Sequence, residues 1–441
     1  MNSTSTPRNA AERLRLAVEV RTRAEIDEAI AIADLAAEQQ WSDAQFDAVC
    51  ADPNRTGADD IALYDEFLPL EVAALKGISV AAATWLIRDI VNLKARHPHL
   101  WFQATRGHIP MFRACQLAGE VARFELTLEQ AQELDAQLAA KAPTLPWRRV
   151  LQLCRGLITD IAPEKVAELA NRARTDRFVR KLPTDDPSVA YLSARVDTAD
   201  AIFFDAMVDR IADILAEQGD ADTKDVRRAK SVGILATPAR AQLLLTGSTD
   251  SPIKATDPRL LPQAQLYVHV AEETLLHGRG TARVEGVGPL SVTMLRHLLG
   301  NCRVRLTPVI RPYSKIAVDA YEIPDRIRNQ VLIRDAVEVF PYSSRPSRNQ
   351  DLDHTEPYRP QRPGQTRADN LGPLSRKVHR AKTHGDWEVE QPSAGVFHWK
   401  SPAGYEYRVG PHGTSRMAVD PRLRQLQQIL WRLDHESPPE R

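Results

Sequence analysis

Apolar residues recur every three or four positions along most of the first half of the chain. The stretch from residue 10 to 45 shows this pattern clearly, with Leu, Val, Ile and Ala repeating among Glu, Arg and Asp. Such spacing places apolar side chains on one face of a helix. With Asp or Ser at plausible helix starts and Pro at breaks, the same pattern predicts helices at about 68–97, 108–122, 127–141, 145–158, 163–174, 199–218 and 223–236.

Shorter segments with strand-like patterns interrupt these helices. RFVRKLP and VAYLSARV, at about 177–196, are predicted to form a strand pair, and QLYVHVAEETL and VRLTPVI, within about 264–310, are further predicted strands. SVTMLRHLLGN, in the same region, is predicted to be a short helix with an N-terminal Ser. We therefore expect a mainly α N-terminal domain with a small α+β portion, in which the apolar stripes form the core.

Composition changes near residue 340, where helix-favouring stretches give way to Pro, Ser, Arg, Asp and Gln up to residue 363. The tail PRLRQLQQILWRLDHESPPER has the pattern of an amphipathic helix, which either packs on its own domain or docks a partner. The chain is therefore predicted to contain a flexible N-terminal tail over 1–25, a mostly helical domain over 26–325, a compact module over 326–415, and a C-terminal helix and tail over 416–441.

Composition excludes several classes of protein. Basic and acidic residues balance at 58 each, so any nucleic-acid surface must be local. No stretch approaches the length of a membrane span, and the first residues lack the apolar core of a signal peptide, so we expect a cytoplasmic protein with no membrane partner. The cysteines lie too far apart for a disulfide scaffold or a Cys-based zinc site. They are Cys50, Cys115, Cys154 and Cys302.

The segment from residue 351 to 387 holds the residue types that phosphodiester hydrolysis needs. In chain order it has an acid beside a histidine, an asparagine before a short apolar turn, and a basic stretch with two histidines: Asp353, His354, Asn370, His379 and His384. Histidine has the pKa of a base that deprotonates water near neutral pH. A divalent metal, held by a carboxylate and an imidazole, meets the charge that develops on the phosphate.

Spacing limits how these side chains act together. On a strand, Asp353 and His354 point to opposite faces, so they act at one site only if the strand bends or the substrate reaches across. His379 and His384 lie five positions apart on a predicted short helix, about 140° around its axis, which disfavours joint binding of one ion. Lys382, three positions after His379, shares its face of the helix.

The same region is locally basic. Between residues 341 and 384, nine basic residues stand against four acids, a balance of +5 in a neutral chain. A phosphate-binding surface needs such an excess, although a solvated loop has the same composition. The nine residues are Arg345, Arg348, Arg359, Arg362, Arg367, Arg376, Lys377, Arg380 and Lys382.

DLDHTEPY and NLGPLSRKVHRAKTHGDW together resemble the HNH (ββα-metal) endonuclease motif, in which a strand pair and a helix hold one divalent cation. With RVEGVGPLSVTMLRHLLG and DAYEIPDRIRNQVLIRDAVEVFPYSSRPSRNQ, the chain resembles an actinobacterial family, the DUF222 or 13E12-repeat proteins, over about residues 30–415. That family pairs a mostly helical domain with a C-terminal HNH segment. The resemblance implies a metal-dependent DNA endonuclease with a C-terminal ββα-metal module.

The resemblance also implies a role for each motif residue. His354 is the general base, and Asp353 and His379 are ligands of a divalent metal, Mg²⁺ or Mn²⁺. Asn370 either orients the loop or joins the metal shell at the catalytic site. Phosphate contacts are expected from residues of the helix: Lys382, His384, Arg376, Lys377 and Arg380. DNA is the expected partner, and no small-molecule cofactor is expected.

The chain departs from the family pattern at its zinc positions. Many relatives carry four cysteines that hold a structural zinc, and this chain has Glu338, Ser343, Gln350 and Ser375 at those places. Thiolates make such a site tight, so no structural zinc is predicted. Val378 also stands where relatives often have a second histidine. The module is either held by packing alone or has begun to decay, so the alternative function is a catalytically degenerate nucleic-acid-binding or scaffold protein.

Overall fold

The chain forms two compact units. One of them combines the N-terminal part of the chain with its C-terminal part. The computed structural model describes residues 10–39, 64–172, 176–182, 184, 189–247, 267–285, 287–299 and 316–418. The first unit comprises Met1–Glu168 with Thr307–Arg441, and the second comprises Leu169–Leu306. The second unit is therefore an insertion in the sequence of the first.

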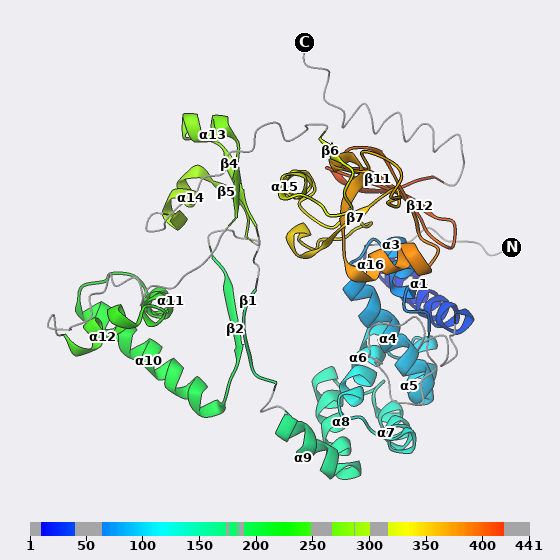
Figure 1. The fold of residues 1–441 in the computed structure, drawn as a ribbon. Helices are drawn as coiled ribbons and strands as arrows, with labels where there is room; N and C mark the ends of the chain where they lie inside the picture. Colours follow the sequence, from blue (N-terminus) through cyan, green and yellow to red (C-terminus); the bar gives the residue numbers. More distant parts are fainter. Residues whose placement is uncertain are drawn as a thin grey trace. The chain divides into compact units, whose positions relative to one another are not determined.

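The first unit begins with helices, as the apolar spacing predicts (Figure 1). They are α1 (Ala10–Glu38), α3 (Leu68–Lys76), α4 (Val80–Arg96), α5 (Pro98–Thr105), α6 (Met111–Ala122), α7 (Leu128–Lys141), α8 (Trp147–Ile161) and α9 (Pro163–Arg172), which crosses into the second unit. Ser79 caps α4, and Thr127 forms a capping box with Gln130 at the start of α7. Gly77, with φ of 67°, ends α3, so the first predicted helix after residue 60 is two helices. The mainly helical N-terminal region is confirmed.

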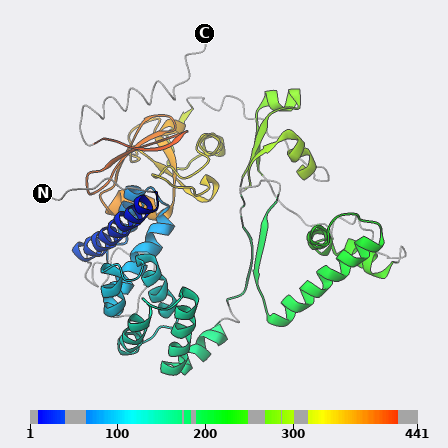
Figure 2. The same cartoon turned by 180° about the vertical axis from the view of Figure 1, so that it is seen from behind.

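Helix α1 includes residues 10–25, where a flexible tail is expected from the sequence. Ion pairs one turn apart, such as Arg15 with Glu19 at 2.6 Å, stabilise this exposed first half. The second half of α1 buries Ile26 and Ile32 and lies against α4 and α6 (Figure 2). Local charge pairing therefore extends the helix beyond the part that reaches the core.

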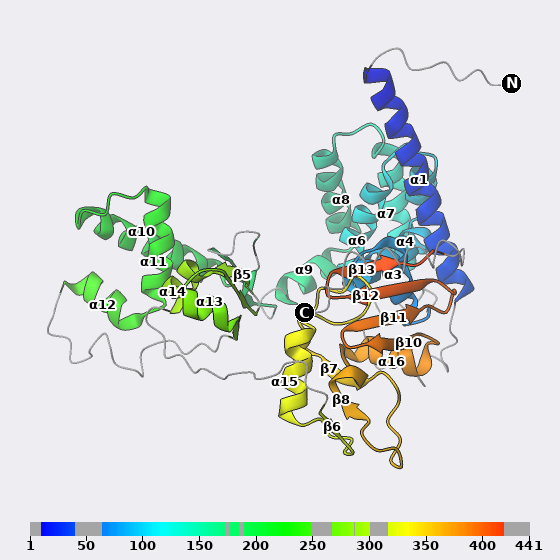
Figure 3. The ribbon, with the colours of Figure 1, turned by 90° about the horizontal axis from the view of Figure 1, so that it is seen from above.

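The C-terminal part of the first unit combines helices with small antiparallel sheets. Its elements are β6 (Ala317–Val318), α15 (Asp325–Arg334), η1 (Ser347–Asn349), β7 (Asp351–His354), β8 (Thr366–Arg367), η2 (Ala368–Asn370), β9 (Leu371–Leu374), α16 (Arg376–His384), β10 (Glu388–Ser393), β11 (Val396–Lys400), β12 (Glu406–Gly410) and β13 (Gly413–Arg416). β7 pairs with β9 and β6 with β8. β10 to β13 form one antiparallel sheet in chain order (Figure 3).

The helices and the C-terminal strands share one core. Trp387, Trp399 and Phe340 pack edge to face, with ring centroids 5.1 to 6.2 Å apart, in the same buried cluster as α3 to α8. A Cβ at Gly385 would come within 2.5 Å of the Phe67 ring, so the end of α16 is in direct contact with the start of α3. Helices before residue 325 and strands after it therefore contribute to one core. Apolar spacing shows which residues face a core, but not which distant segments share it.

The second unit contains the predicted strand pair and further short elements. They are β1 (Phe178–Leu182), β2 (Tyr191–Arg195), α10 (Thr198–Glu217), α11 (Lys224–Leu235), α12 (Pro238–Thr246), β3 (Val268–Val270), α13 (Glu272–His277), β4 (Thr281–Val284), β5 (Gly288–Ser291) and α14 (Val292–Leu299). Helix α12 was not predicted, and the strand predicted in QLYVHVAEETL ends at Val270, where α13 follows. VRLTPVI lies outside the described residues.

Two of the cysteines are buried thiols. Cys115 and Cys154 are free and buried, and burial raises the pKa of each to about 12. Thiols with such a pKa stay protonated near neutral pH and are poor nucleophiles. Cys50 and Cys302 lie outside the described residues.

Within the described part of the chain, no single helix has both the length and the apolar composition of a membrane span. The bent pair α3 and α4, at 110°, meets that test on length and composition alone. Both helices bury apolar side chains in the core of the first unit. Most of the predicted C-terminal helix and tail, from residue 419 onward, lies outside the described residues.

Candidate active site

Two strands and a helix hold the residues that the sequence analysis singled out. β7 pairs with β9 so that Asp353 lies opposite Gly372 and His354 lies opposite Leu371. Ser375 follows β9 and caps the N-terminus of α16. β9 leads through Ser375 directly into α16. The pairing of β7 with β9 therefore brings side chains of β7 close to those of α16.

Asp353 is paired with two residues of α16. Nε2 of His379 lies 3.1 Å from Oδ1 of Asp353, and Nζ of Lys382 lies 2.7 Å from Oδ2. The Lys382 ammonium also donates a hydrogen bond to the carbonyl oxygen of His354. His379 and Lys382 thus share a helix face, as their spacing predicts. The His379 side chain is 36% exposed, so the cluster reaches solvent on that side.

These contacts shift the pKa of both Asp353 and His379. Burial raises the pKa of Asp353, but the hydrogen bond from His379 and the charge of Lys382 together outweigh it, so the pKa lies below its ordinary value. The hydrogen bond to Asp353 raises the pKa of His379, against the effects of burial and of Lys382. A metal ion that binds His379 must therefore displace a proton that Asp353 helps to hold.

The His354 ring contacts a different set of residues from Asp353, as strand alternation predicts. Nε2 of His354 lies 2.8 Å from Oγ1 of Thr366, on β8. The ring stacks on Tyr321 and lies beside Tyr358, with both centroids 5.7 Å away. Burial lowers the pKa of His354 against the opposing charge of Asp353, and the charge of Lys382 lowers it further, so the ring is mostly neutral at neutral pH.

Asn370 holds the loop that follows β7. Its Oδ1 accepts a hydrogen bond from the amide of Glu356 at 2.8 Å, and its Nδ2 donates to the carbonyl of Gln365 at 3.0 Å. The side chain is buried. Of the two roles that the resemblance leaves open, these contacts favour orientation of the loop, because backbone groups of that loop engage both polar atoms.

The predicted phosphate contacts differ in how accessible they are. Arg380 pairs with Glu66 at 3.2 Å, and both side chains are mostly buried, so this pair holds α16 against the segment before α3. Arg376 also makes an ion pair, but its side chain is 75% exposed. His384, the last residue of α16, is exposed, and Lys377 is half-buried. Arg376 and His384 are therefore the most accessible candidates on the helix.

Ion pairs reduce the local charge excess seen in the sequence. Of the nine basic residues between 341 and 384, at least five pair with carboxylates: Arg362, Arg367, Arg376, Arg380 and Lys382. One of the carboxylate partners, Glu66, comes from outside this segment. The surface open to a polyanion is therefore smaller than the charge count implies.

The family that the chain resembles often carries cysteines at four positions, and three of these positions lie close together in this structure. Glu338 is buried and accepts hydrogen bonds from the hydroxyl of Ser343 at 2.7 Å and from the amide of Ser375 at 2.6 Å. Gln350 instead donates to the carbonyl of Pro346. One carboxylate with two hydroxyl groups does not fit the thiolate and imidazole set of a structural zinc. Hydrogen bonds join these segments instead.

The chemistry of Asp353 and His379 does fit a hard divalent ion. Mg²⁺ and Mn²⁺ favour carboxylate oxygens, and Mg²⁺ keeps several of its waters, so one or two protein ligands suffice. Among the residues that the structure describes, no group of three or more His, Cys, Asp or Glu side chains is arranged to hold a metal. Water and substrate would therefore supply most of the ligands at this pair.

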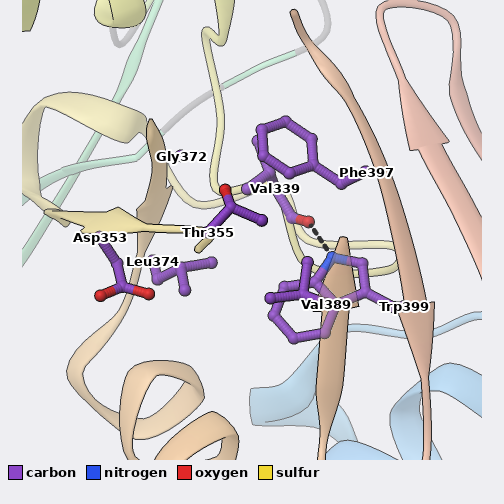
Figure 4. A pocket seen from close by; sticks show the side chains of 8 residues that line it. All are labelled: Val339, Asp353, Thr355, Gly372, Leu374, Val389, Phe397 and Trp399. Carbon is purple, nitrogen blue, oxygen red and sulfur yellow. Dashed lines mark hydrogen bonds between the residues drawn. The ribbon is translucent and has the colours of Figure 1, made fainter. Parts of the chain in front are cut away.

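A small cavity lies behind Asp353, on the apolar side of the strands (Figure 4). It measures about 10 Å³ and is lined by Val339, Asp353, Thr355, Gly372, Leu374, Val389, Phe397 and Trp399. A Cβ at Gly372 would approach Val339 and Phe397 to 2.8 Å, so the packing requires glycine there. This volume is about that of a single water probe, so it does not admit a substrate. The accessible side of the cluster is therefore the exposed one, near His379.

Several residues of the site have no clear signal in the sequence. Thr366 is a single buried threonine within a polar stretch, and its contact with His354 depends on the pairing of β6 with β8. Glu66 lies far before its partner Arg380 in the chain. Tyr321 lies within DAYEIPD, one of the segments that carry the family resemblance. That resemblance is the signal in the sequence that points to this residue.

Comparison of the chain with protein-family models, with curated proteins and with solved structures found no match. The contacts of Asp353, His354 and His379 are the structural basis for a function. Those contacts combine a carboxylate and an imidazole at an exposed edge with a second, neutral imidazole on the same strand.

Proposed function

We propose that the chain is a metal-dependent endonuclease of HNH type that hydrolyses phosphodiester bonds in DNA. The observation that carries this proposal is the 3.1 Å pairing of Asp353 Oδ1 with His379 Nε2, next to a strand residue, His354, that is neutral at neutral pH. A carboxylate and an imidazole that face each other are a suitable donor pair for a divalent ion. The arrangement of β7, β9 and α16 supports a ββα-metal site.

Each residue has a role that follows from its contacts. Asp353 and His379 hold Mg²⁺ or Mn²⁺, which when bound stabilises negative charge on the phosphate. His354 accepts a proton from the attacking water, because its lowered pKa leaves the ring unprotonated. The Lys382 ammonium, held by Asp353 and by the His354 carbonyl, adds positive charge beside the phosphate.

The substrate class follows from the exposed end of the site. Arg376 and His384 are accessible at the two ends of α16 and contact phosphates that neighbour the scissile bond. Such contacts recognise the backbone rather than the bases, so we expect binding that weakens with salt and depends little on sequence.

Cleavage of supercoiled plasmid tests the proposal. Purified full-length protein is incubated with Mg²⁺, Mn²⁺ or EDTA, beside His354→Ala and a matched control, His108→Ala. His108 is exposed and contacts Gln103, at a distance in sequence from every site residue. We expect nicking that needs metal, survives in His108→Ala, and falls by about 10²- to 10⁴-fold in His354→Ala.

The two possible failures of this experiment have different meanings. Nicking at the wild-type rate by His354→Ala would remove the assignment of the general base but not the activity. No nicking with any metal, in protein that still binds DNA, would reject the endonuclease.

A catalytically degenerate nucleic-acid-binding protein is the second candidate. It is favoured by the Lys382 ammonium, which lies 2.7 Å from Asp353 and neutralises the carboxylate without a metal. Calorimetric titration with Mn²⁺ separates the two candidates. Binding that Asp353→Asn abolishes supports the enzyme, whereas salt-sensitive DNA binding without Mn²⁺ binding supports the degenerate protein. A scaffold would bind neither.

A further inference from the structure

The hydroxyl group of Thr366 connects His354 to the backbone of a neighbouring segment. Oγ1 of Thr366 donates a hydrogen bond to the carbonyl oxygen of Ala320 at 2.6 Å and lies 2.8 Å from Nε2 of His354. A hydroxyl has one proton to donate and two lone pairs that accept. The carbonyl of Ala320 has no proton, so the hydroxyl proton must lie on that bond. The contact with His354 therefore needs a proton on Nε2.

This arrangement leaves the other ring nitrogen of His354 unprotonated. A neutral imidazole carries one proton, and the hydrogen bond at one nitrogen decides which nitrogen has it. Within the described residues, the side-chain hydrogen bond of His354 is made at Nε2. Nδ1 of the neutral ring therefore keeps its lone pair and can accept a proton.

The segments that hold Thr366 are themselves well anchored. Thr366 is fully buried and pairs with Val318 in the short sheet of β6 and β8. Asp319 accepts hydrogen bonds from the amide of Gly364, through its side chain, and from the hydroxyl of Tyr358, through its carbonyl. The hydroxyl of Thr366 is thus fixed in position on both sides, so it presents a constant acceptor to His354.

We infer that Thr366 is a positioning residue that holds His354 in the tautomer protonated on Nε2 and so directs Nδ1 toward the attacking water. The consequence for catalysis rests on the proposed function, whereas the hydrogen bond itself does not. Thr366 does not touch substrate; it acts through His354. The role requires the hydroxyl group and not only the volume of the side chain.

Two substitutions separate the hydroxyl from the volume. Thr366→Val keeps the shape of the side chain but removes the acceptor for Nε2. Thr366→Ser keeps the hydroxyl and loses one methyl group. A merely structural role predicts that valine, which fills the site, is the milder change. The positioning role predicts the reverse for the tautomer and for the rate.

The tautomer is read directly by long-range ¹H–¹⁵N correlation spectra of the full-length protein with ¹⁵N-labelled histidine, at about pH 8, where a histidine of lowered pKa is neutral. The His354→Ala spectrum assigns the signals of His354. We expect the wild type and Thr366→Ser to show a protonated Nε2 and an unprotonated Nδ1. Thr366→Val is expected to show a mixture of tautomers. Circular dichroism verifies that each variant is folded.

Rates of plasmid nicking give a second, separate readout. We expect kcat to fall by about 10- to 100-fold in Thr366→Val, with KM unchanged, and Thr366→Ser to retain most of the activity. Protonation on Nδ1 in the wild type, or an unchanged tautomer in Thr366→Val, would overturn the inference. If the tautomer responds as expected but no form of the protein cleaves DNA, the inference holds and the proposed function fails.

Discussion

Asp353 and Glu338, two carboxylates that contact α16 and its N-cap, have opposite surroundings. Asp353 lies between His379 and Lys382, at an edge that reaches solvent. Glu338 is 1% exposed and accepts hydrogen bonds from the Ser343 hydroxyl and the Ser375 amide, which are neutral donors. The same chemical group thus meets ionisable partners at one position and fixed neutral partners at the other.

This difference gives the two carboxylates different roles. Asp353 can exchange a partner for a metal ion, whereas Glu338 holds segments of the fold together. His379 can lose its proton and is partly exposed, so a metal ion can take its place beside Asp353 at modest structural cost. The donors of Glu338 are fixed in the fold, and the buried Ser375 amide would lose its acceptor if the carboxylate were removed, at about 1–3 kcal/mol. We therefore expect changes at Asp353 to affect activity and changes at Glu338 to affect stability.

The largest effect is expected from Asp353→Asn. The amide keeps the shape of the side chain but binds a divalent ion poorly, so plasmid nicking should fall by about 10³-fold, equivalent to several kcal/mol of transition-state stabilisation. The free energy of unfolding, measured with urea, should change less than in the Glu338 variant, because Lys382 keeps the His354 carbonyl as a partner. Nicking within threefold of the wild type would show that Asp353 is not a ligand.

Glu338→Ala should reverse this pattern. It removes the acceptor of the buried Ser375 amide and of the Ser343 hydroxyl and opens a cavity, so the free energy of unfolding should fall by about 3 kcal/mol. Nicking by the fraction that remains folded should be close to that of the wild type. Glu388→Ala, which removes an exposed glutamate near Lys400, is the matched control and should change stability by less than about 0.5 kcal/mol. Equal stability of the two variants would contradict the anchoring role.

The sequence predicts contacts between residues that lie close together in the chain, but not contacts between distant segments. His379 and Lys382 lie three positions apart, and that spacing alone predicts that they share a face. The helices of the first half follow from apolar spacing in the same way. Glu338, in contrast, lies 37 positions before Ser375 in the chain, and their contact depends on how distant segments pack in the folded protein. Its role depends on tertiary packing and has no local pattern.

The four-stranded sheet of β10 to β13 is a second example of a contact that a local sequence pattern does not predict. Its strands do alternate, as in Val389 between Glu388 and Glu390, but no sheet is predicted there from the sequence. The sheet matters because Trp399 donates to the Val339 carbonyl at 2.7 Å and so ties β11 to the chain next to Glu338. Alternation predicts such strands, but it does not predict which segment they cover.

Protons and metal should compete at the Asp353 end, with a smaller effect. The hydrogen bond to Asp353 raises the pKa of His379, so this pair stabilises the metal-free fold fully below the unfolded pKa of about 6.5, and the contribution is lost as pH rises through the folded pKa. Metal needs the unprotonated ring, so its affinity rises over the same range. The acid limb of the nicking rate should move to lower pH by up to about one unit per tenfold rise in Mn²⁺. The lowered pKa of His354 sets the limit of that movement. If the pH position of the acid limb does not change with the Mn²⁺ concentration, His379 is not a ligand.

Metal added to or removed from the folded protein should act on the stability through Asp353 and not through Glu338. Saturating Mn²⁺, at about 100 times its Kd, should stabilise the wild type by about 2.7 kcal/mol at most, and weaker occupancy by less. The same increment should appear in Glu338→Ala and be absent in Asp353→Asn, because the metal belongs to one carboxylate only. EDTA alone should leave the Tm of the metal-free protein unchanged within about 1 °C, since hydrogen bonds join the segments at Glu338 and their side chains do not suit zinc. Unfolding by EDTA would place a structural metal in the fold and remove the distinction between the two carboxylates.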